Sequence, residues 1–168
     1  MSRATVRAAI AAWFAPPNVA FVGYIYRAQP KIELPVLNKN TLTVGSPSSA
    51  SGVVWIAKER EMRIAAGGPT GGYKHILYDC SLVLHFNSVH PQLESAMDDF
   101  DVMIESVKER LRAGRATVLG TSTGSAPLFN VGEDAPGIDI DYDMPTLVQN
   151  VTYIWAALSF GVEEIIYA

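Results

Sequence analysis

KHILYDCSLVLHF, residues 74–86, is the stretch of this sequence that decides the fold. Apolar residues recur at every second position, and successive side chains of a β-strand point to opposite faces of a sheet. One face of the expected strand is therefore apolar throughout and carries Ile76, Tyr78, Cys80, Leu82, Leu84 and Phe86. The other face is mixed and carries Leu77, Asp79, Ser81, Val83 and His85. This pattern predicts a long strand with one face on a hydrophobic core.

A second long strand is expected just before it, in VVWIAKEREMRIA (53–65). Val54, Ile56, Met62 and Ile64 have the same parity, with Lys58 and Arg60 between them. That spacing predicts a strand with an exposed middle, or one arm of a hairpin that leaves the body. The preceding Ser/Gly-rich segment 45–52 is expected to be a loop.

Two amphipathic helices are predicted. Over about 91–113 the apolar period changes to steps of four and three, through Leu93, Met97, Phe100, Ile104, Val107 and Leu111. Acidic residues lie toward its start and basic residues toward its end, which suits the helix dipole, and Gly114 provides a stop. An N-terminal helix is expected over about 3–15, ended by Pro16 and Pro17. The sequence of this segment is also similar to a short signal peptide, but its apolar residues lie on one side of the helix, which favours an amphipathic helix packed against the rest of the protein.

Further strands are expected at 21–28, 116–119, 126–131, 137–142 and about 150–166. Strands follow one another instead of alternating with helices, which indicates an α+β fold with a mainly antiparallel sheet. The chain of 168 residues contains no linker-like stretch, so residues 1–168 are expected to form a single domain with both helices on one face.

Composition excludes several classes of protein. The net charge of −4 and the pI of about 5.3 argue against a free-standing nucleic-acid-binding protein. One cysteine excludes an intrachain disulfide framework and a cysteine zinc cluster. No apolar run approaches the ~20 residues of a membrane helix, so no membrane partner is expected. The mean hydropathy of +0.16 is slightly high, and it suggests that some apolar surface is buried against partners.

The glycine-rich stretch AGGPTGGYK (66–74) invites a phosphate-binding interpretation. Gly67 and Gly72 have the spacing of a P-loop, but Tyr73 stands where the motif needs lysine. His75 follows Lys74 where Ser or Thr is required, and a strand pattern follows where a helix is required. The stretch is therefore interpreted as the tip of a hairpin, over about 66–73.

Two other motifs point to chemistry. GTSTG (120–124) matches the nucleophile elbow G-x-S-x-G with Ser122 at its centre, but Pro127 and Gly132 prevent the helix that must follow. DIDYD (139–143) puts three carboxylates at alternate positions, yet Met144 and Asn150 replace the Gly and Glu of a calcium-binding loop. We expect no catalytic residues, no cofactor and no bound metal. A strand here would carry all three carboxylates on a solvated or partner-facing side, opposite Ile138, Ile140 and Tyr142.

Four segments together resemble a known family. They are FVGYIYRAQPK (21–31), RIAAGGPTGGYKHILYDCSLVLHF (63–86), MDDFDVMIESVKERLRA (97–113) and YIWAALSFGVEEII (153–166), after an N-terminal VRAAIAAWFAPP. Their order and pattern resemble those of the tail-terminator proteins of long-tailed, siphovirus-type bacteriophages, particularly phages of actinobacteria.

The resemblance implies a small α+β subunit with a curved sheet and no enzymatic activity. It implies a homohexameric ring in the virion, assembled in the host cytoplasm, that caps the tail tube and joins it to the head connector. The partners would be further copies, the tail tube protein and the connector or neck protein, and genome DNA would pass through without sequence-specific binding. A head-completion or connector subunit is the alternative, and a small hydrolase or metal-binding enzyme is a third.

Two sets of interface residues are proposed on this basis. The hairpin tip is expected to contact a neighbouring subunit or the tube through Gly67, Gly68, Pro69, Thr70, Gly71, Gly72 and Tyr73. Charged contacts between subunits, or with a basic partner, are expected from Lys58, Arg60, Arg63, Asp139, Asp141 and Asp143.

Overall fold

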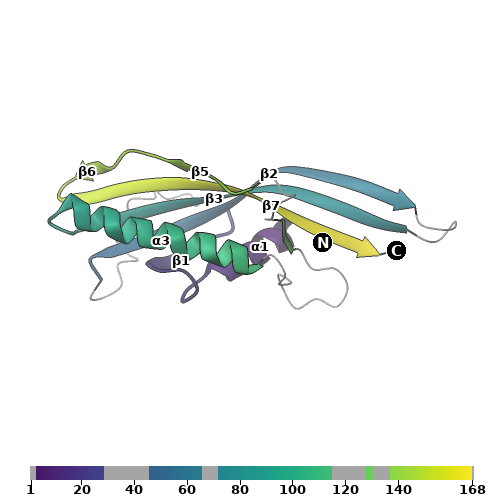
Figure 1. The fold of residues 1–168 in the computed structure, drawn as a ribbon, viewed down its shortest axis with the longest axis horizontal. Coiled ribbons are helices and arrows are strands. Elements are labelled where there is room, and N and C mark those ends of the chain that lie inside the picture. Colours follow the sequence, from purple (N-terminus) through teal and green to yellow (C-terminus); the bar gives the residue numbers. More distant parts are fainter. Residues whose placement is uncertain (1–2, 29–45, 66–71, 115–127, 131–136, 168) are drawn as a thin grey trace.

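A computed structural model describes residues 3–28, 46–65, 72–114, 128–130 and 137–167. Within these ranges the chain forms an α+β fold, as expected (Figure 1). The helices are α1 (Arg3–Phe14) and α3 (Leu93–Ala113). The strands are β1 (Val22–Tyr26), β2 (Ser48–Ala65), β3 (Gly72–Ser88), β4 (Leu128–Asn130), β5 (Asp139–Tyr142), β6 (Thr146–Val148) and β7 (Val151–Tyr167).

All the described strands belong to one open, mostly antiparallel sheet in the order β1-β2-β3-β7. β1 pairs with β2 in parallel, while β2–β3 and β3–β7 are long antiparallel pairs. The short strands β6, β5 and β4 follow one another along the outer edge of β7. The three long strands therefore form the centre of the sheet.

The hydrophobic core lies on one face of this sheet. Every residue assigned to the apolar row of β3 is buried, and the row continues on β7 at Ile154, Ala156, Leu158, Phe160 and Val162. Both helices pack on this face, α1 through Val6, Ile10 and Phe14. α3 contributes Phe100, Met103, Ile104, Val107 and Leu111. The expected placement of two amphipathic helices on one face is thus confirmed.

The two helices are joined by a reciprocal contact. Trp13 Nε1 donates a hydrogen bond to the carbonyl oxygen of Arg110, and Arg110 Nε donates one to the carbonyl oxygen of Trp13, both at 3.1 Å. The Arg110 guanidinium carbon also lies 3.8 Å from the centroid of the Trp13 ring, a cation–π geometry. The contact attaches the end of α1 to the last turns of α3.

The start of β2 differs from the prediction, because residues 48–52 belong to the strand and not to a loop. Ser49 Oγ donates a hydrogen bond to Asn87 Oδ1 at 2.6 Å, so its polar side chain has a partner inside the protein. At Gly52 a Cβ atom would come within 2.6 Å of Ile25 Cδ1 and 3.1 Å of Leu82 Cδ1. Glycine is therefore required here by close packing, although in the sequence it has the character of a loop residue.

A β-bulge in β2 corrects the predicted parity of that strand. The register shifts between Ile56 and Lys58, which leaves Ala57 as the extra residue. Val54 and Ile56 point into the core, whereas Met62 pairs with His75 and points to the opposite face. An extra residue reverses the alternation of side chains after it, so the prediction that Met62 lies on the same face as Val54 and Ile56 was wrong.

The helices cover only part of the sheet. β2, β3 and β7 continue beyond them as a three-stranded arm, which Figure 1 shows at the end that carries the label C. We define the arm as residues 58–65, 72–79 and 161–167. A hairpin arm of this kind was expected, but Gly72 and Tyr73 belong to β3 and pair with Ala65 and Ile64. The last two residues of the expected tip are therefore part of the paired strands. Its other residues, 66–71, lie outside the described ranges.

Other boundaries agree with the prediction to within a few residues. β7 and α3 match their expected ranges closely, and α3 begins after Gln92 and ends at Ala113, with Gly114 as its C-cap. β6 was not expected, and the strand predicted at 116–119 lies outside the described residues.

Candidate functional site

The face of the sheet opposite α1 and α3 is covered by no described helix, and we call it the helix-free face. Its central residues on β3 and β7 are mostly small or uncharged: Ser81, Val83 and His85, with Trp155, Ala157 and Ser159. Two tryptophans on this face are largely exposed, Trp55 at 54% and Trp155 at 41%. The helix-free face is therefore a broad surface of the sheet that no described helix covers.

The acidic row of DIDYD lies along one margin of this face. β5 pairs with β7 so that Asp139 is opposite Ser159 and Asp141 is opposite Ala157. Asp143 continues the row by donating its backbone N–H to the Trp155 carbonyl oxygen at 3.1 Å. All three carboxylates are exposed, and none forms an ion pair with a described residue.

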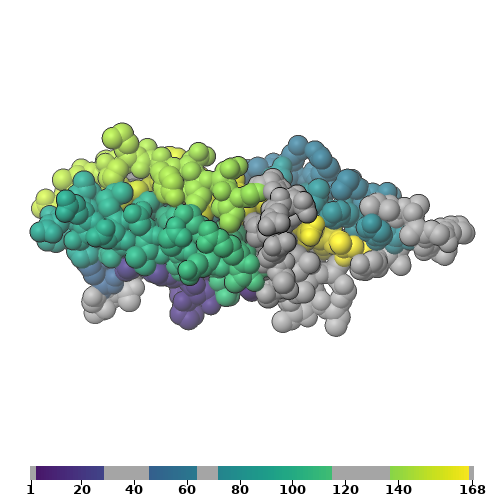
Figure 2. All heavy atoms as spheres, in the orientation of Figure 1, coloured from purple at the N-terminus to yellow at the C-terminus, as the bar shows by residue number. Residues whose placement is uncertain are grey.

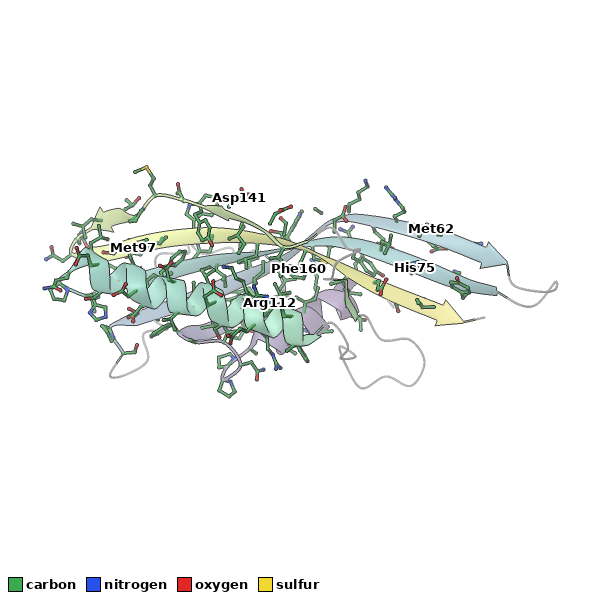
Figure 3. The ribbon with its side chains drawn as sticks, viewed as in Figure 1. Met62, His75, Met97, Arg112, Asp141 and Phe160 are labelled. Carbon is green, nitrogen blue, oxygen red and sulfur yellow. The ribbon has the colours of Figure 1, made fainter. Side chains whose placement is uncertain are left out.

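The expected separation of the two sides of this segment is confirmed. Ile138 and Ile140 pack against the core, and the Tyr142 ring lies edge-on to Phe100 with centroids 6.1 Å apart. These contacts hold β5 in one orientation, so Asp139 and Asp141 point away from the helices. Figure 3 labels Asp141 at this edge, well away from Met62 and His75 on the arm.

The basic residues are divided between two faces. Lys58 and Arg60 pair with Asp79 and Leu77 and lie on the helix-free face, where both are exposed. Arg63 has the opposite parity, and its Nε donates to Glu61 Oε1 at 2.9 Å on the other side of the strand. The predicted basic set of Lys58, Arg60 and Arg63 is therefore not one surface, because Arg63 stands an odd number of residues from Lys58 and Arg60 on a regular part of the strand.

The acidic and basic rows do not meet within one chain. β3 and β7 lie between β2 and β5, and three inter-strand spacings amount to about 14 Å. Lys58 and Arg60 thus lie at one margin of the helix-free face and the aspartates at the other. The sequence predicted both rows, and the structure adds that they occupy opposite edges.

The acidic margin is also unusually apolar. Tyr142, Met144, Leu147 and Val148 are all exposed, with Met144 at 80% and Leu147 at 71%. Figure 2 shows residues 137–150 as a ridge along the body above α3. Among the described strands none pairs with the outer side of β5 or β6, so within this part of the chain the margin is a sheet edge that also carries apolar side chains.

Two shallow hollows open on the helix-free face. One of about 300 Å³ is lined by Asp79 and Asp139 with the small residues Ala57, Ser81 and Gly161. The second, of about 150 Å³, lies between β6 and β7 and is lined in part by His85, Asp143 and Trp155. Burial lowers the pKa of His85, so its ring is neutral at neutral pH.

A serine, a histidine and an aspartate meet elsewhere, at the start of β2, and the sequence patterns did not reveal this group. Asp99 Oδ2 lies 2.6 Å from Ser48 Oγ and 3.1 Å from His90 Nε2. Ser48 Oγ is also 2.9 Å from Ser88 Oγ. In a hydrolase triad the histidine lies between the serine and the acid, whereas here the aspartate is the central group. The cluster therefore attaches α3 to the ends of β2 and β3 and activates no nucleophile.

The buried titratable groups of the core are also chemically inert. Tyr78 Oη donates to Glu164 Oε2 at 3.1 Å, and burial together with the Glu164 charge raises the pKa of Tyr78. Burial raises the pKa of the Cys80 thiol to about 12. Neither group ionises near neutral pH, so neither the phenol nor the thiol is an activated nucleophile there.

The described part of the chain has neither a cluster of metal-binding side chains nor a membrane-spanning helix. Its His, Cys, Asp and Glu side chains include no group of three that could hold a metal ion. None of the helices there has both the length and the apolar character that a membrane crossing requires. The candidate nucleophile Ser122 lies outside the described residues.

No family model matches the sequence, and no curated protein matches it. The function is therefore argued from the surfaces described above.

Proposed function

We propose that this protein is a structural subunit of a bacteriophage tail. Copies of it would form a ring, hexameric as the resemblance implies, that caps the tail tube, ends its polymerisation and connects it to the neck of the head. The chain would be made in the host cytoplasm and would remain at the head-proximal end of the tail. Its partners would be other copies, the tube protein and the neck protein, with genome DNA passing through the ring.

One observation carries the proposal. The fold leaves the helix-free face without a described helix over it and continues that face along the arm, where Lys58, Arg60 and Asp79 are exposed, so this face is available for contact. Exposed apolar residues at its edge add to this, since large exposed apolar patches mark interaction sites. The groups described above that resemble catalytic sites are either wrongly ordered or buried and neutral. The order of segments resembling that of tail terminators is consistent with such a surface.

Light scattering after size exclusion tests the proposal directly. The protein alone, and mixed with the tube protein, is expected to form a closed oligomer that binds the ends of tubes and stops their growth. A chain that stays monomeric at all concentrations and never associates with tubes would refute it.

Two further measurements separate the alternatives. Cryo-electron microscopy of intact particles distinguishes a terminator from a connector subunit, because only the terminator contacts the last ring of the tube. For the enzyme alternative, hydrolysis by the wild type that is lost in Ser122→Ala would contradict a purely structural role.

A further inference from the structure

We propose that neighbouring copies join edge to edge, with the β2 arm of one copy pairing along the β5 edge of the next. This inference rests on the proposed ring and specifies its contact. The partner of the acidic, apolar β5–β6 margin is then a second copy of this chain.

Charge complementarity is the first argument. Asp139, Asp141 and Asp143 form a row at one margin of the helix-free face, and Lys58 and Arg60 form a row at the other. None of these side chains has an ion-pair partner among the described residues, and about 14 Å separates the rows within one chain. Asp79 lies opposite Lys58 on β3 without forming an ion pair with it, so both rows keep charged side chains with which a second copy can pair.

Strand direction is the second argument. β2 and β7 run in the same direction because both are antiparallel to β3, and β5 is antiparallel to β7. When a second copy continues the sheet with its helices on the same side, its β2 is antiparallel to β5. Antiparallel strands place residues in directly opposed pairs, so a register with Lys58 opposite Asp141 also sets Arg60 opposite Asp139.

Free backbone groups are the third argument. β1 pairs with β2 only as far as Val53, and beyond it no described strand pairs with the outer side of β2. The outer side of β5 is likewise unpaired among the described strands. Two such edges can satisfy each other's hydrogen bonds, as in strand addition between chains. Because the two edges differ, the contact is heterologous, and its repetition gives a ring when the rotation closes.

Charge reversal tests the contact. Lys58→Glu with Arg60→Glu, and separately Asp139→Lys with Asp141→Lys, replace attraction by repulsion at one edge each. We expect either double variant to raise the dissociation constant of self-association at least tenfold. A mixture of the two variants is expected to assemble again, since intact edges meet intact edges and reversed edges meet reversed edges. Asp98→Lys with Asp101→Lys makes the same charge change on the exposed side of α3 and is expected to have no effect.

Disulfide trapping tests the geometry even where association is weak. A disulfide requires Cα atoms within about 7 Å, so cysteines at Lys58 and Asp141 cannot be bridged within one chain. Cys80 is 2% exposed and does not interfere. Under mild oxidation, Lys58→Cys with Asp141→Cys is expected to give covalent oligomers, and Lys58→Cys with Asp101→Cys is not.

The outcomes separate the two proposals. Wild-type oligomers that are unaffected by both charge reversals, together with no trapped oligomers, would overturn the edge contact and leave the ring intact. A wild-type chain that does not assemble, together with no covalent oligomers from the variant with Lys58→Cys and Asp141→Cys, would overturn both. Circular dichroism checks that each variant is folded, as expected for substitutions at exposed positions.

Discussion

Gly52 allows the packing of the core to be tested quantitatively. A Cβ added at this position would lie 2.6 Å from Ile25 Cδ1, 3.1 Å from Leu82 Cδ1 and 3.1 Å from Leu84 Cδ2. Overpacking of a core costs about 1–3 kcal/mol, whereas replacing glycine by alanine returns about 0.4–1 kcal/mol through the unfolded state. We therefore expect Gly52→Ala to lower the free energy of unfolding by about 1–2 kcal/mol.

Ile25→Val removes the atom in closest contact and completes a double-mutant cycle. Alone it is expected to cost about 0.5–1.5 kcal/mol, as is usual for a buried methyl group. In the Gly52→Ala background it relieves the clash, so the double variant is expected to be more stable than the sum of the two effects by about 1 kcal/mol.

Equilibrium unfolding in urea at one protein concentration, followed by tryptophan fluorescence, measures all four proteins. Ser159→Ala, at an exposed position on the other face, is the control and should combine additively with Ile25→Val. The reasoning fails when Gly52→Ala is neutral or stabilising, or when the Gly52–Ile25 cycle is additive within about 0.5 kcal/mol.

Two further predictions concern the helices and the core. Arg110→Ala removes a hydrogen bond and a cation–π contact to Trp13, so it is expected to lower the free energy of unfolding in urea by about 1–2 kcal/mol. The control Arg112→Ala, at an exposed position, is expected to change it by no more than about 0.5 kcal/mol. Equal losses in the two variants would contradict a role of Arg110 in joining the helices. Burial raises the pKa of Cys80 from 9.0 to about 12, so the folded state keeps a proton that the unfolded state loses, and stability falls as the pH rises above 9.0. Between pH 8 and pH 10 the wild type should lose about 1.4 kcal/mol more than Cys80→Ala, and parallel curves for the two proteins would exclude this linkage.

The alternation of β3 and the apolar stripe of α3 could be predicted because each is decided by local periodicity. Six alternating apolar residues on β3 are all buried as expected, and their outer neighbours form the helix-free face. The same alternation places Trp155 between the buried Ile154 and Ala156, so its outward position was available from the sequence although it was not singled out.

The remaining features depend on residues that are distant in the chain. Ser48 and Ser49 belong to a strand because their hydroxyls find partners at Asp99 and Asn87, which no local pattern reveals. The bulge at Ala57 is a single inserted residue, and it turned Met62 to the face opposite Val54 and Ile56 without a local sequence signal. The three-residue strand β6 is too short to show a sequence periodicity, and it is defined by its pairing with β7.

The long central strands also determine how the molecule would respond to mechanical force. β3 and β7 are aligned over their whole length, from Tyr73–Tyr167 at the end of the arm to Ser88–Thr152 beside the start of α3. A pull along the arm therefore acts parallel to the strands, and the cross-strand hydrogen bonds share the tension in shear instead of opening one after another. Tension applied at the arm would reach the core through continuous paired strands without passing through a hinge. The subunit would therefore transmit the load along its length with little bending.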